Sequence, residues 1–331
     1  MRRLRYRVAL NEALREELQR DPAVFLIGED MRDPFGGTYK VTQGLSDEFG
    51  PERILNTPIA EGGFVGAALG AALVGLRPVV ELMYLDFALL ASDQIINQIA
   101  KITYMTGGQV KVPLVIRTQG GGYKSSAAQH GQTLEALFAH IPGLVVLMPA
   151  TPADAKGLLK TAIRLDDPVL FIEHKSLYFE SGEVPQGDHL IPIGEADIKR
   201  TGSDLTIVTW AMGVKLALAA AEELANEGID IEVVDVRSLV PLDEATILDS
   251  VEKTGRLVVL HEAVRRGGFG GEIAATVSEN LFGLLKAPVA RVGALACPLP
   301  MAPNLEQVVL PQVRDVIAAA RDVMNKTAAV A

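Results

Sequence analysis

The sequence has 331 residues, of which 49% are hydrophobic and 22% charged, so it can bury a large core and is long enough for two domains. The net charge is -10 and neither half of the chain is basic, which excludes nucleic acid and anionic membranes as the main partners. Cys297 is the only cysteine, which excludes a disulfide framework and a cysteine-based metal site within one chain.

The chain shows no pattern for secretion or membrane insertion. Its basic start, MRRLRYR, reaches Asn11 and Glu12 before any apolar stretch as long as that of a signal peptide. No window contains the ~18 uninterrupted apolar residues that cross a membrane. We therefore expect a cytoplasmic protein with no membrane partner.

In the first half of the chain, runs rich in Val and Ile alternate with helical patterns. The expected strands are 24–28, 78–84, 113–118, 144–149 and 168–174, and the expected helices lie near 7–19, 62–75, 88–105, 132–139 and 152–164. Thr151, Pro152 and Asp154 form a helix start, with a capping hydroxyl, a proline at the first position and an acid in the first turn. This alternation predicts a parallel sheet covered on both faces.

The second half repeats the alternation after an irregular segment. Residues 176–202 are rich in Gly, Pro and charges, and we place a linker at 186–202 between domains at 1–185 and 203–331. The following strands are expected at 205–210, 231–237, 256–262 and 288–293, with helices near 213–227, 243–253, 270–282 and 311–324. The predicted fold is therefore α/β, with two doubly wound domains in tandem.

A single acid, Glu61, is the only ionisable residue within 54–76, where a loop enters a helix rich in Gly and Ala. Such a carboxylate either complements the helix dipole or is a partly buried acid that faces a ligand or partner. The helix also has a smooth face of glycines at fourfold spacing, which lets another backbone approach within the domain or across a subunit interface: Gly62, Gly66 and Gly70.

Two loops that follow expected strands are further candidates. The loop 120–132, GGGYKSSAAQHGQ, ends near His130, which is either a general acid or base or a local hydrogen-bonding residue. The segment 261–272, HEAVRRGGFGGE, is similar to a dinucleotide fingerprint, but Ile273 stands where the third glycine belongs, so the match is weak. Arg265 and Arg266 in this segment face either solvent or a ligand.

Several long blocks resemble the beta subunits of thiamine-diphosphate-dependent 2-oxo acid dehydrogenases. The blocks include NTPIAEGGFVGAALGAALVGLRPVVELMYLDF, AAQHGQ, DDPVLFIEHKSLY and HEAVRRGGFGGEI, and the resemblance extends from about Val8 to Leu310. It implies a transketolase-like pyrimidine-binding domain followed by a transketolase C-terminal-like domain. Beta subunits that cleave acetoin are similar in most of these blocks.

The resemblance implies roles for particular residues. The acid at Glu61 is expected to be catalytic and to hydrogen-bond the aminopyrimidine ring of thiamine diphosphate, which favours the imino tautomer that removes the thiazolium C2 proton. Phe87 is expected to stack on that ring, Met83 to bind the cofactor beside it, and His130 to face the lipoyl arm as a second catalytic residue. Backbone carbonyls of five residues match a monovalent-cation site, for K⁺, found in some members: Leu114, Ala162, Ile163, Leu165 and Asp167.

The sequence departs from the family pattern close to these positions. The usual TPISE reads TPIAE, with Ala60 in place of a hydroxyl, and AQHSQ reads AQHGQ, with Gly131 after His130. Leu165 replaces a polar residue that is commoner at the cation site. The first two changes remove hydrogen-bonding groups near the expected substrate, so the choice among 2-oxo acids stays open.

The expected active site is incomplete in this chain. Thiamine enzymes hold the diphosphate through Mg²⁺ on a Gly-Asp-Gly segment, and that triplet is absent from the sequence. We therefore expect an alpha subunit that holds the Mg²⁺, an α2β2 heterotetramer, a lipoyl-bearing acyltransferase as second component, and a small 2-oxo acid as substrate. The alternatives are an acetoin-cleaving or branched-chain 2-oxo acid dehydrogenase beta subunit, a non-catalytic assembly subunit, and a nucleotide-binding oxidoreductase that uses the 267–272 loop.

Overall fold

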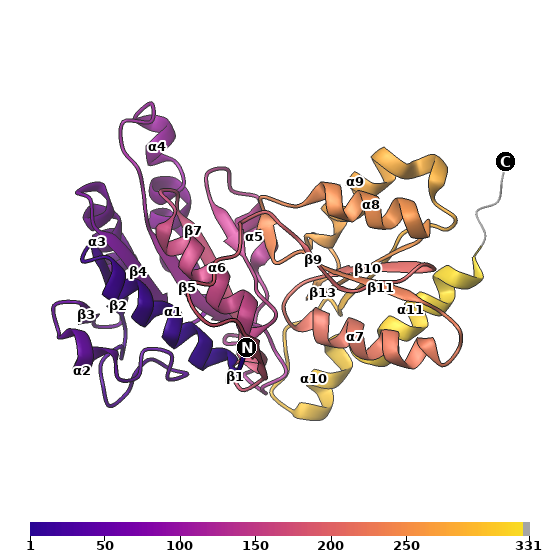
Figure 1. Cartoon of the computed structure of the whole chain (residues 1–331), viewed down its shortest axis with the longest axis horizontal. Helices are drawn as coiled ribbons and strands as arrows, with labels where there is room; N and C mark the ends of the chain where they lie inside the picture. Colours follow the sequence, from indigo (N-terminus) through magenta and orange to yellow (C-terminus); the bar gives the residue numbers. More distant parts are fainter. Residues whose placement is uncertain (327–331) are drawn as a thin grey trace. The chain divides into compact units, whose positions relative to one another are not determined.

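The computed structural model describes residues 1–326, which form two compact units (Figure 1). The first unit contains Met1–Gly120 and Leu137–Ile193, and the second contains Gly121–Ala136 and the chain from Gly194 onward. The loop that carries His130 therefore belongs to the second unit, although it lies in the first half of the sequence. The domain boundaries expected from the sequence stay a prediction.

The first unit is built on a parallel sheet. Its strands lie in the order β6 (Val145–Leu147), β7 (Val169–His174), β5 (Val115–Gly120), β4 (Arg77–Leu82), β2 (Val24–Gly28) and β3 (Ile54–Asn56). Every residue of β2, β5 and β7 is buried, as expected of strands in a parallel sheet that is covered on both faces. A separate antiparallel pair joins β1 (Arg2–Arg5) to β8 (Ser181–Val184).

Helices α1 (Tyr6–Arg20) and α6 (Pro152–Arg164) of the first unit pack on each other, and α3 (Glu61–Leu73) packs on the π-helix η2 (Asp93–Ile99). As predicted, Thr151 caps α6, because its hydroxyl accepts the amide of Asp154 at 3.1 Å. The remaining helices of this unit are short: α2 (Leu45–Phe49), the 3₁₀-helices η1 (Leu85–Leu89) and η3 (Lys175–Leu177), and α4 (Ile102–Met105).

The expectation of one helix near 88–105 is wrong. The segment is divided among η1, η2 and α4, which wind as 3₁₀-, π- and α-helix. In η2 the winding is wide, and the amide of Ala100 donates to the carbonyl of Ile95, five residues back, at 3.1 Å. The spacing of apolar residues is similar for the three windings over so few turns, so the pattern does not distinguish them.

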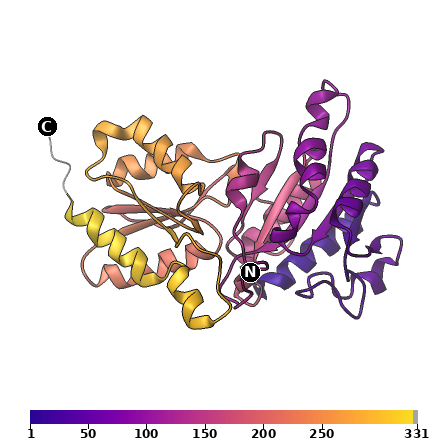
Figure 2. The same cartoon turned by 180° about the vertical axis from the view of Figure 1, so that it is seen from behind.

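The second unit is also doubly wound. Its strands lie in the order β14 (Ala290–Ala294), β13 (Leu257–Val264), β10 (Leu205–Thr209), β11 (Ile231–Asp235) and β9 (Asp197–Arg200), and only the β11–β9 pairing is antiparallel. Helix α7 (Met212–Ala225) packs on α11 (Val313–Asn325), and α8 (Glu244–Thr254) packs on α9 (Gly270–Leu281). Figures 1 and 2 show these two pairs on opposite sides of the sheet, which confirms the predicted arrangement.

Shorter elements complete the second unit: α5 (Glu135–Ala139), in which the chain returns to the first unit, β12 (Ser238–Val240), η4 (Phe282–Leu284) and α10 (Pro303–Val309). The core of this unit lies between the sheet and the α7–α11 pair. It contains Leu205, Ile207, Val233 and Leu260 from strands, and Ala217, Ala220, Val316 and Ala320 from helices.

A buried ion network crosses the middle of the first sheet. Arg117 on β5 donates to both carboxylate oxygens of Glu173 on β7, at 2.6 and 2.8 Å, and to Glu81 on β4 at 2.9 Å. The hydroxyl of Tyr178 donates to Glu173 at 2.6 Å. All three charged side chains are at most 1% exposed. The network therefore joins three neighbouring strands through one guanidinium.

We expect Arg117→Met to lower the free energy of unfolding by about 3–5 kcal/mol, because two carboxylates would stay buried without their cation. Urea denaturation of the purified protein measures this loss, with Arg314→Met as the control because the Arg314 side chain is 71% exposed. Adding Glu81→Gln and Glu173→Gln to Arg117→Met should recover part of the loss. A loss below about 1 kcal/mol would show that the network does not support the sheet.

Candidate functional site

Glu61 is the first residue of α3, and only 6% of it is exposed. The residue before it, Ala60, is the N-cap and makes no side-chain capping bond, so Glu61 supplies the negative charge that a helix N-terminus favours. The first turn of α3 is packed against the chain after η1, where the carbonyl of Leu90 would lie 3.4 Å from a Cβ on Gly62. The helix N-terminus and this packing give Glu61 a structural role. Whether Glu61 also binds a ligand depends on the polar groups around it.

Two residues at the carboxyl end of β2 carry buried polar atoms that have no hydrogen-bond partner among the described residues: Oε1 of Glu29 and Oγ1 of Thr57. Glu29 follows β2, and its pKa responds to the charge of Glu61, which places the two carboxyl groups near each other. The amide of Thr57 donates to the carbonyl of Gly28 at 2.9 Å, so Thr57 lies beside the end of the same strand. Unsatisfied buried atoms of this kind are rare in proteins and indicate where a polar ligand would complete the bonding.

Burial raises the pKa of Glu29 to about 7, and the negative charges of Glu61 and Asp30 act in the same direction. The residue is 7% exposed. Sequence reasoning does not single out Glu29, although a signal was present, because an acid directly after the buried strand 24–28 lies at the carboxyl end of a parallel sheet.

Phe87 and Met83 lie at the carboxyl end of β4. Phe87 is half-buried in η1, with its ring edge-on to Tyr84 at a centroid separation of 6.4 Å. Met83 is also half-buried, and its sulfur accepts the hydroxyl of Thr38. The first unit therefore holds Phe87 and Met83 on the segment after β4, whose end packs against the first turn of α3 where Glu61 lies.

The glycine face of α3 is used mainly within the first unit. Beside the contact of Gly62 with Leu90, a Cβ on Gly66 would lie 3.4 Å from the side-chain oxygen of Gln94 on η2. Nothing lies within 4 Å of the corresponding point on Gly70. The within-domain alternative therefore holds for the first two glycines, and a subunit contact is an option only around Gly70.

His130 is exposed on the loop 121–136, which belongs to the second unit. Beside the loop is a hollow of about 460 Å³, whose lining includes Gly131, Thr133, Glu262 and Leu299. The predicted site residues thus form two sets. Glu61, Met83 and Phe87 belong to the first unit, and His130 belongs to the second.

The structure does not favour a cation at the five predicted carbonyls. The oxygens of Ile163 and Leu165 accept hydrogen bonds from the guanidinium of Arg77 at 3.1 and 2.9 Å. The oxygen of Leu114 accepts the amide of Val169 at 2.9 Å. A K⁺ ion at this place would lie against a fixed positive charge, which repels it. The residues present therefore do not fit the ion, and we give it no part in the function.

Two of the four glycines in the HEAVRRGGFGGE segment, Gly268 and Gly270, have a packing role. A Cβ on Gly268 would lie 2.6 Å from the ring of His261, and one on Gly270 would lie 2.5 Å from it. The ring of His261 is buried and stacks on Trp210 at a centroid separation of 5.6 Å. Burial lowers the pKa of His261 to about 4, so the ring stays neutral. These contacts explain Gly268 and Gly270 without a dinucleotide.

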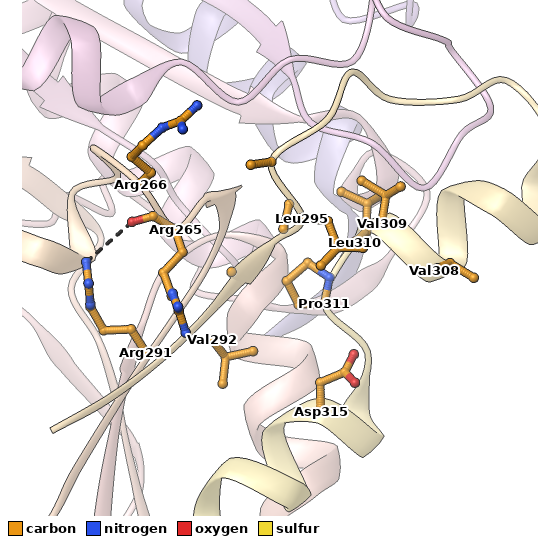
Figure 3. Close-up of a pocket in the computed structure, with 13 residues that line it drawn as sticks. Arg265, Arg266, Arg291, Val292, Leu295, Val308, Val309, Leu310, Pro311 and Asp315 are labelled. Atoms are coloured by element: carbon orange, nitrogen blue, oxygen red, sulfur yellow. Dashed lines mark hydrogen bonds between the residues drawn. The ribbon is translucent and has the colours of Figure 1, made fainter. Parts of the chain in front are cut away.

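A second hollow of the second unit, about 500 Å³, has three arginines in its lining: Arg265, Arg266 and Arg291 (Figure 3). Arg291 donates to the carbonyl of Arg265 at 3.3 Å, and the two side chains lie next to each other. Arg266 points away from both in Figure 3. The charges do not converge on one point, so this hollow gives no defined anion site.

Residues 1–326 contain neither a ready-made metal centre nor a membrane-crossing helix. No group of three or more His, Cys, Asp or Glu side chains in this range is arranged to hold a metal ion. No helix in this part of the chain is both long and apolar enough to cross a bilayer. A Mg²⁺ site made only by the described side chains of this chain is therefore not supported.

Comparison with known families first defines the class of protein. Residues 2–180 match the transketolase pyrimidine binding domain, and residues 194–316 match the transketolase C-terminal domain. A solved structure described as a split gene transketolase, inactive beta4 tetramer, superposes with a TM-score of 0.80 at 27% identity, over 97% of this chain and 98% of that one. Both predicted domain types and their order are confirmed.

Relatives of known function narrow the class. The acetoin:2,6-dichlorophenolindophenol oxidoreductase subunit beta of Cupriavidus necator is 48% identical, over 98% of both chains. The pyruvate dehydrogenase E1 component subunit beta of Rickettsia conorii is 50% identical, over 96% of this chain and 97% of that one. The chain belongs to the family of dehydrogenase beta subunits that these two proteins represent, which confirms the predicted resemblance.

The raised pKa of Glu29 predicts a pH-dependent stability. Because the folded pKa of about 7 exceeds the ordinary value of 4.5, the folded state keeps the proton longer, and Glu29 lowers stability as pH rises from 4.5 to 7. The substitution Glu29→Gln should therefore have little effect on the free energy of unfolding at pH 4.5, and should raise it by about 1–2 kcal/mol at pH 8.

Urea unfolding at several pH values tests this expectation. Glu52→Gln is the control, since Glu52 is an exposed acid of the same unit. If the stability of the Glu29→Gln protein depends on pH as that of the wild type does, the pKa of Glu29 is not raised in the folded protein. That result would remove the evidence that Glu29 and Glu61 lie close together.

Proposed function

We propose that the chain is the beta subunit of a thiamine-diphosphate-dependent 2-oxo acid dehydrogenase that transfers an acyl group to a lipoyl domain. The observation that carries the proposal is the buried carboxyl of Glu61 near that of Glu29, which has a buried oxygen without a partner among the described residues. The family membership supports it, because the matched domain is the one named for binding a pyrimidine.

The residues of the first unit fit an aminopyrimidine ring. Such a ring offers donors and acceptors at its edge, which suit Glu61, Glu29 and Thr57, and an apolar face, which suits Phe87 and Met83. When bound, thiamine diphosphate supplies a nucleophilic carbon that adds to the oxo group and stabilises the charge left by decarboxylation.

The part of this chain in the reaction is to hold and move one proton. Glu61 would hold a proton at its carboxyl group toward the ring, and its burial keeps water from competing for that bond. Glu29, whose pKa is raised to about 7, limits negative charge beside Glu61 near neutral pH. The Gly and Ala residues of α3 bring no competing polar side chain to this site.

The diphosphate and its Mg²⁺ would be held by an alpha subunit. This chain has no Gly-Asp-Gly triplet, and its described residues form no metal-binding cluster. The structural neighbour is a beta4 tetramer of a split-gene transketolase described as inactive, which is the behaviour expected of one part without the other. We therefore propose an α2β2 heterotetramer.

His130 would serve the acceptor side of the reaction. It is exposed on a loop of the second unit, where a side chain can meet a lipoyl arm carried by an acyltransferase component. Its role would be to orient the dithiolane or to donate a proton to it.

The cytoplasmic location stays a prediction.

The substrate is proposed to be pyruvate, with acetoin as the second candidate because the relative from Cupriavidus necator is almost as similar. A branched-chain 2-oxo acid is the third. Steady-state turnover of the reconstituted alpha and beta subunits with pyruvate, 3-methyl-2-oxobutanoate and acetoin separates the three. A higher kcat/KM for acetoin than for pyruvate would overturn the first choice.

Glu61→Gln should reduce turnover of the reconstituted complex by about 10²–10⁴-fold, because glutamine keeps the volume of the side chain but cannot exchange the proton. Circular dichroism and assembly with the alpha subunit should not change. Glu52→Gln, in which an exposed acid of the same unit is replaced, is the matched control. Activity of the Glu61→Gln complex within threefold of wild type would contradict the assignment of Glu61 as the acid that exchanges the proton.

A further inference from the structure

The loop 121–136 has a backbone that needs support from outside. Three of its residues other than glycine have left-handed conformations: Tyr123 (φ 60°), Ser125 (φ 53°) and Ala127 (φ 59°). Residues with side chains adopt this region at a cost and keep it only where the surroundings determine it. The groups that stabilise this backbone therefore also fix the position of the loop and of His130 on it.

The first support comes from the end of β13. Glu262 is 8% exposed, and its Oε1 accepts the amide of Gly122 at 2.6 Å and the hydroxyl of Thr133 at 2.9 Å. Gly122 lies near the beginning of the loop and Thr133 near its end. One carboxylate therefore joins the two ends of the segment that contains His130.

The second support comes from α10. Glu306 is 4% exposed and accepts the amide of Lys124 at 3.3 Å and that of Ser125 at 3.2 and 3.1 Å. Tyr123 lies between the two anchored positions, and its hydroxyl donates to the carbonyl of Pro311 at 2.7 Å. Burial, with the charges of Glu262 and Glu306, raises the pKa of Tyr123, so the hydroxyl remains a donor.

Apolar side chains fix the loop as well. A Cβ on Gly122 would lie 2.5 Å from Cδ1 of Leu310, and one on Gly131, next to His130, would lie 2.9 Å from Cδ1 of Leu299. The loop thus has little room to shift toward these leucines. Gly131 has no side chain of its own that could help to hold the loop.

We propose that Glu262 and Glu306 are positioning residues, a pair of carboxylates that hold the His130 loop in its strained conformation through its own backbone amides. Buried carboxylates need several donors, and charge-assisted bonds to amides are stronger than neutral ones, so the loop and the acids stabilise each other. The geometry of the loop does not depend on the proposed function. The kinetic consequence rests on it, because it requires that His130 serve the lipoyl acceptor.

Hydrogen exchange of the intact protein, followed by mass spectrometry, tests the geometry directly. In Glu262→Ala and Glu306→Ala the amides of 122–125 should exchange at least about tenfold faster than in wild type, because their acceptors are gone. The Glu→Gln variants keep one acceptor oxygen and should show a smaller increase. Glu279→Ala, in which an exposed acid on α9 is replaced, is the matched control. Unchanged protection of β10 and β11 shows that a variant is folded.

The kinetic arm uses the complex reconstituted with the alpha subunit. The Glu→Ala variants should lower kcat/KM for a lipoyl-domain acceptor by about tenfold, while reduction of ferricyanide, which needs no lipoyl arm, stays within about twofold. The Glu→Gln variants should regain most of the lipoyl-dependent rate. A general loss of stability would lower the rates with both acceptors alike. It would not explain a recovery of the lipoyl-dependent rate in the Glu→Gln variants.

Each outcome decides a separate point. Wild-type exchange at 122–125 in both Glu→Ala variants would overturn the carboxylate support. Faster exchange with an unchanged lipoyl-dependent rate would overturn the positioning role and leave a structural attachment. Faster exchange with equal loss for both acceptors would contradict the role proposed for His130, while the geometry of the loop would stand.

Discussion

The guanidinium of Arg117 is the constraint on which the arrangement of the first unit depends. It lies opposite Glu81 in the register of β4 and β5, and it also bonds Glu173 on β7. A buried cation with two carboxylates tolerates no slip of one strand against the next, because a slip would leave charges unpaired in the interior. The carboxyl ends of these strands are therefore fixed, and β4 leads directly to Met83 and Phe87.

The same unit contains two kinds of buried acid, and the difference between them indicates function. Glu81 accepts hydrogen bonds from Arg117 and Gln119, and Glu173 accepts two from Arg117 and one from Tyr178. Glu29 has a buried oxygen without a partner among the described residues and a raised pKa. Carboxylates whose oxygens all accept hydrogen bonds are typical of a structural network. An acid with an unpaired buried oxygen next to a second acid is typical of a site where a ligand binds or a proton moves. The proposed functional site thus lies beside a fully hydrogen-bonded ion network.

Much of the fold could be predicted from the sequence because several of its strands are, or begin with, continuous apolar runs. The strand 24–28 and the helix 152–164 have the predicted bounds, the latter because Thr151 and Pro152 define its start. The short edge strands β1 and β8 could not be found, since most of their residues are exposed and show no apolar run. The π-winding of η2 was hidden because it changes hydrogen bonding rather than composition.

The candidate site was predictable only in part. Glu61 stands out as a lone acid in an apolar segment, but the role of Glu29 depends on a contact between residues far apart in the chain. The supports of the His130 loop, Glu262 and Glu306, lie more than 120 residues beyond it, and no local pattern joins them. Conversely, the glycines after His261 suggest a nucleotide loop, whereas Gly268 and Gly270 serve the packing of a buried ring.

The central claim is that this chain holds the activating acid of a thiamine site and lacks the part that holds the diphosphate. Calorimetric titration of thiamine diphosphate with Mg²⁺ into the purified chain, alone and with an alpha subunit that contains a Gly-Asp-Gly segment, tests it most directly. The account predicts tight, Mg²⁺-dependent binding by the pair, and weak binding without turnover by the lone chain. Tight, Mg²⁺-dependent binding by the lone chain, together with decarboxylase activity, would contradict the divided site.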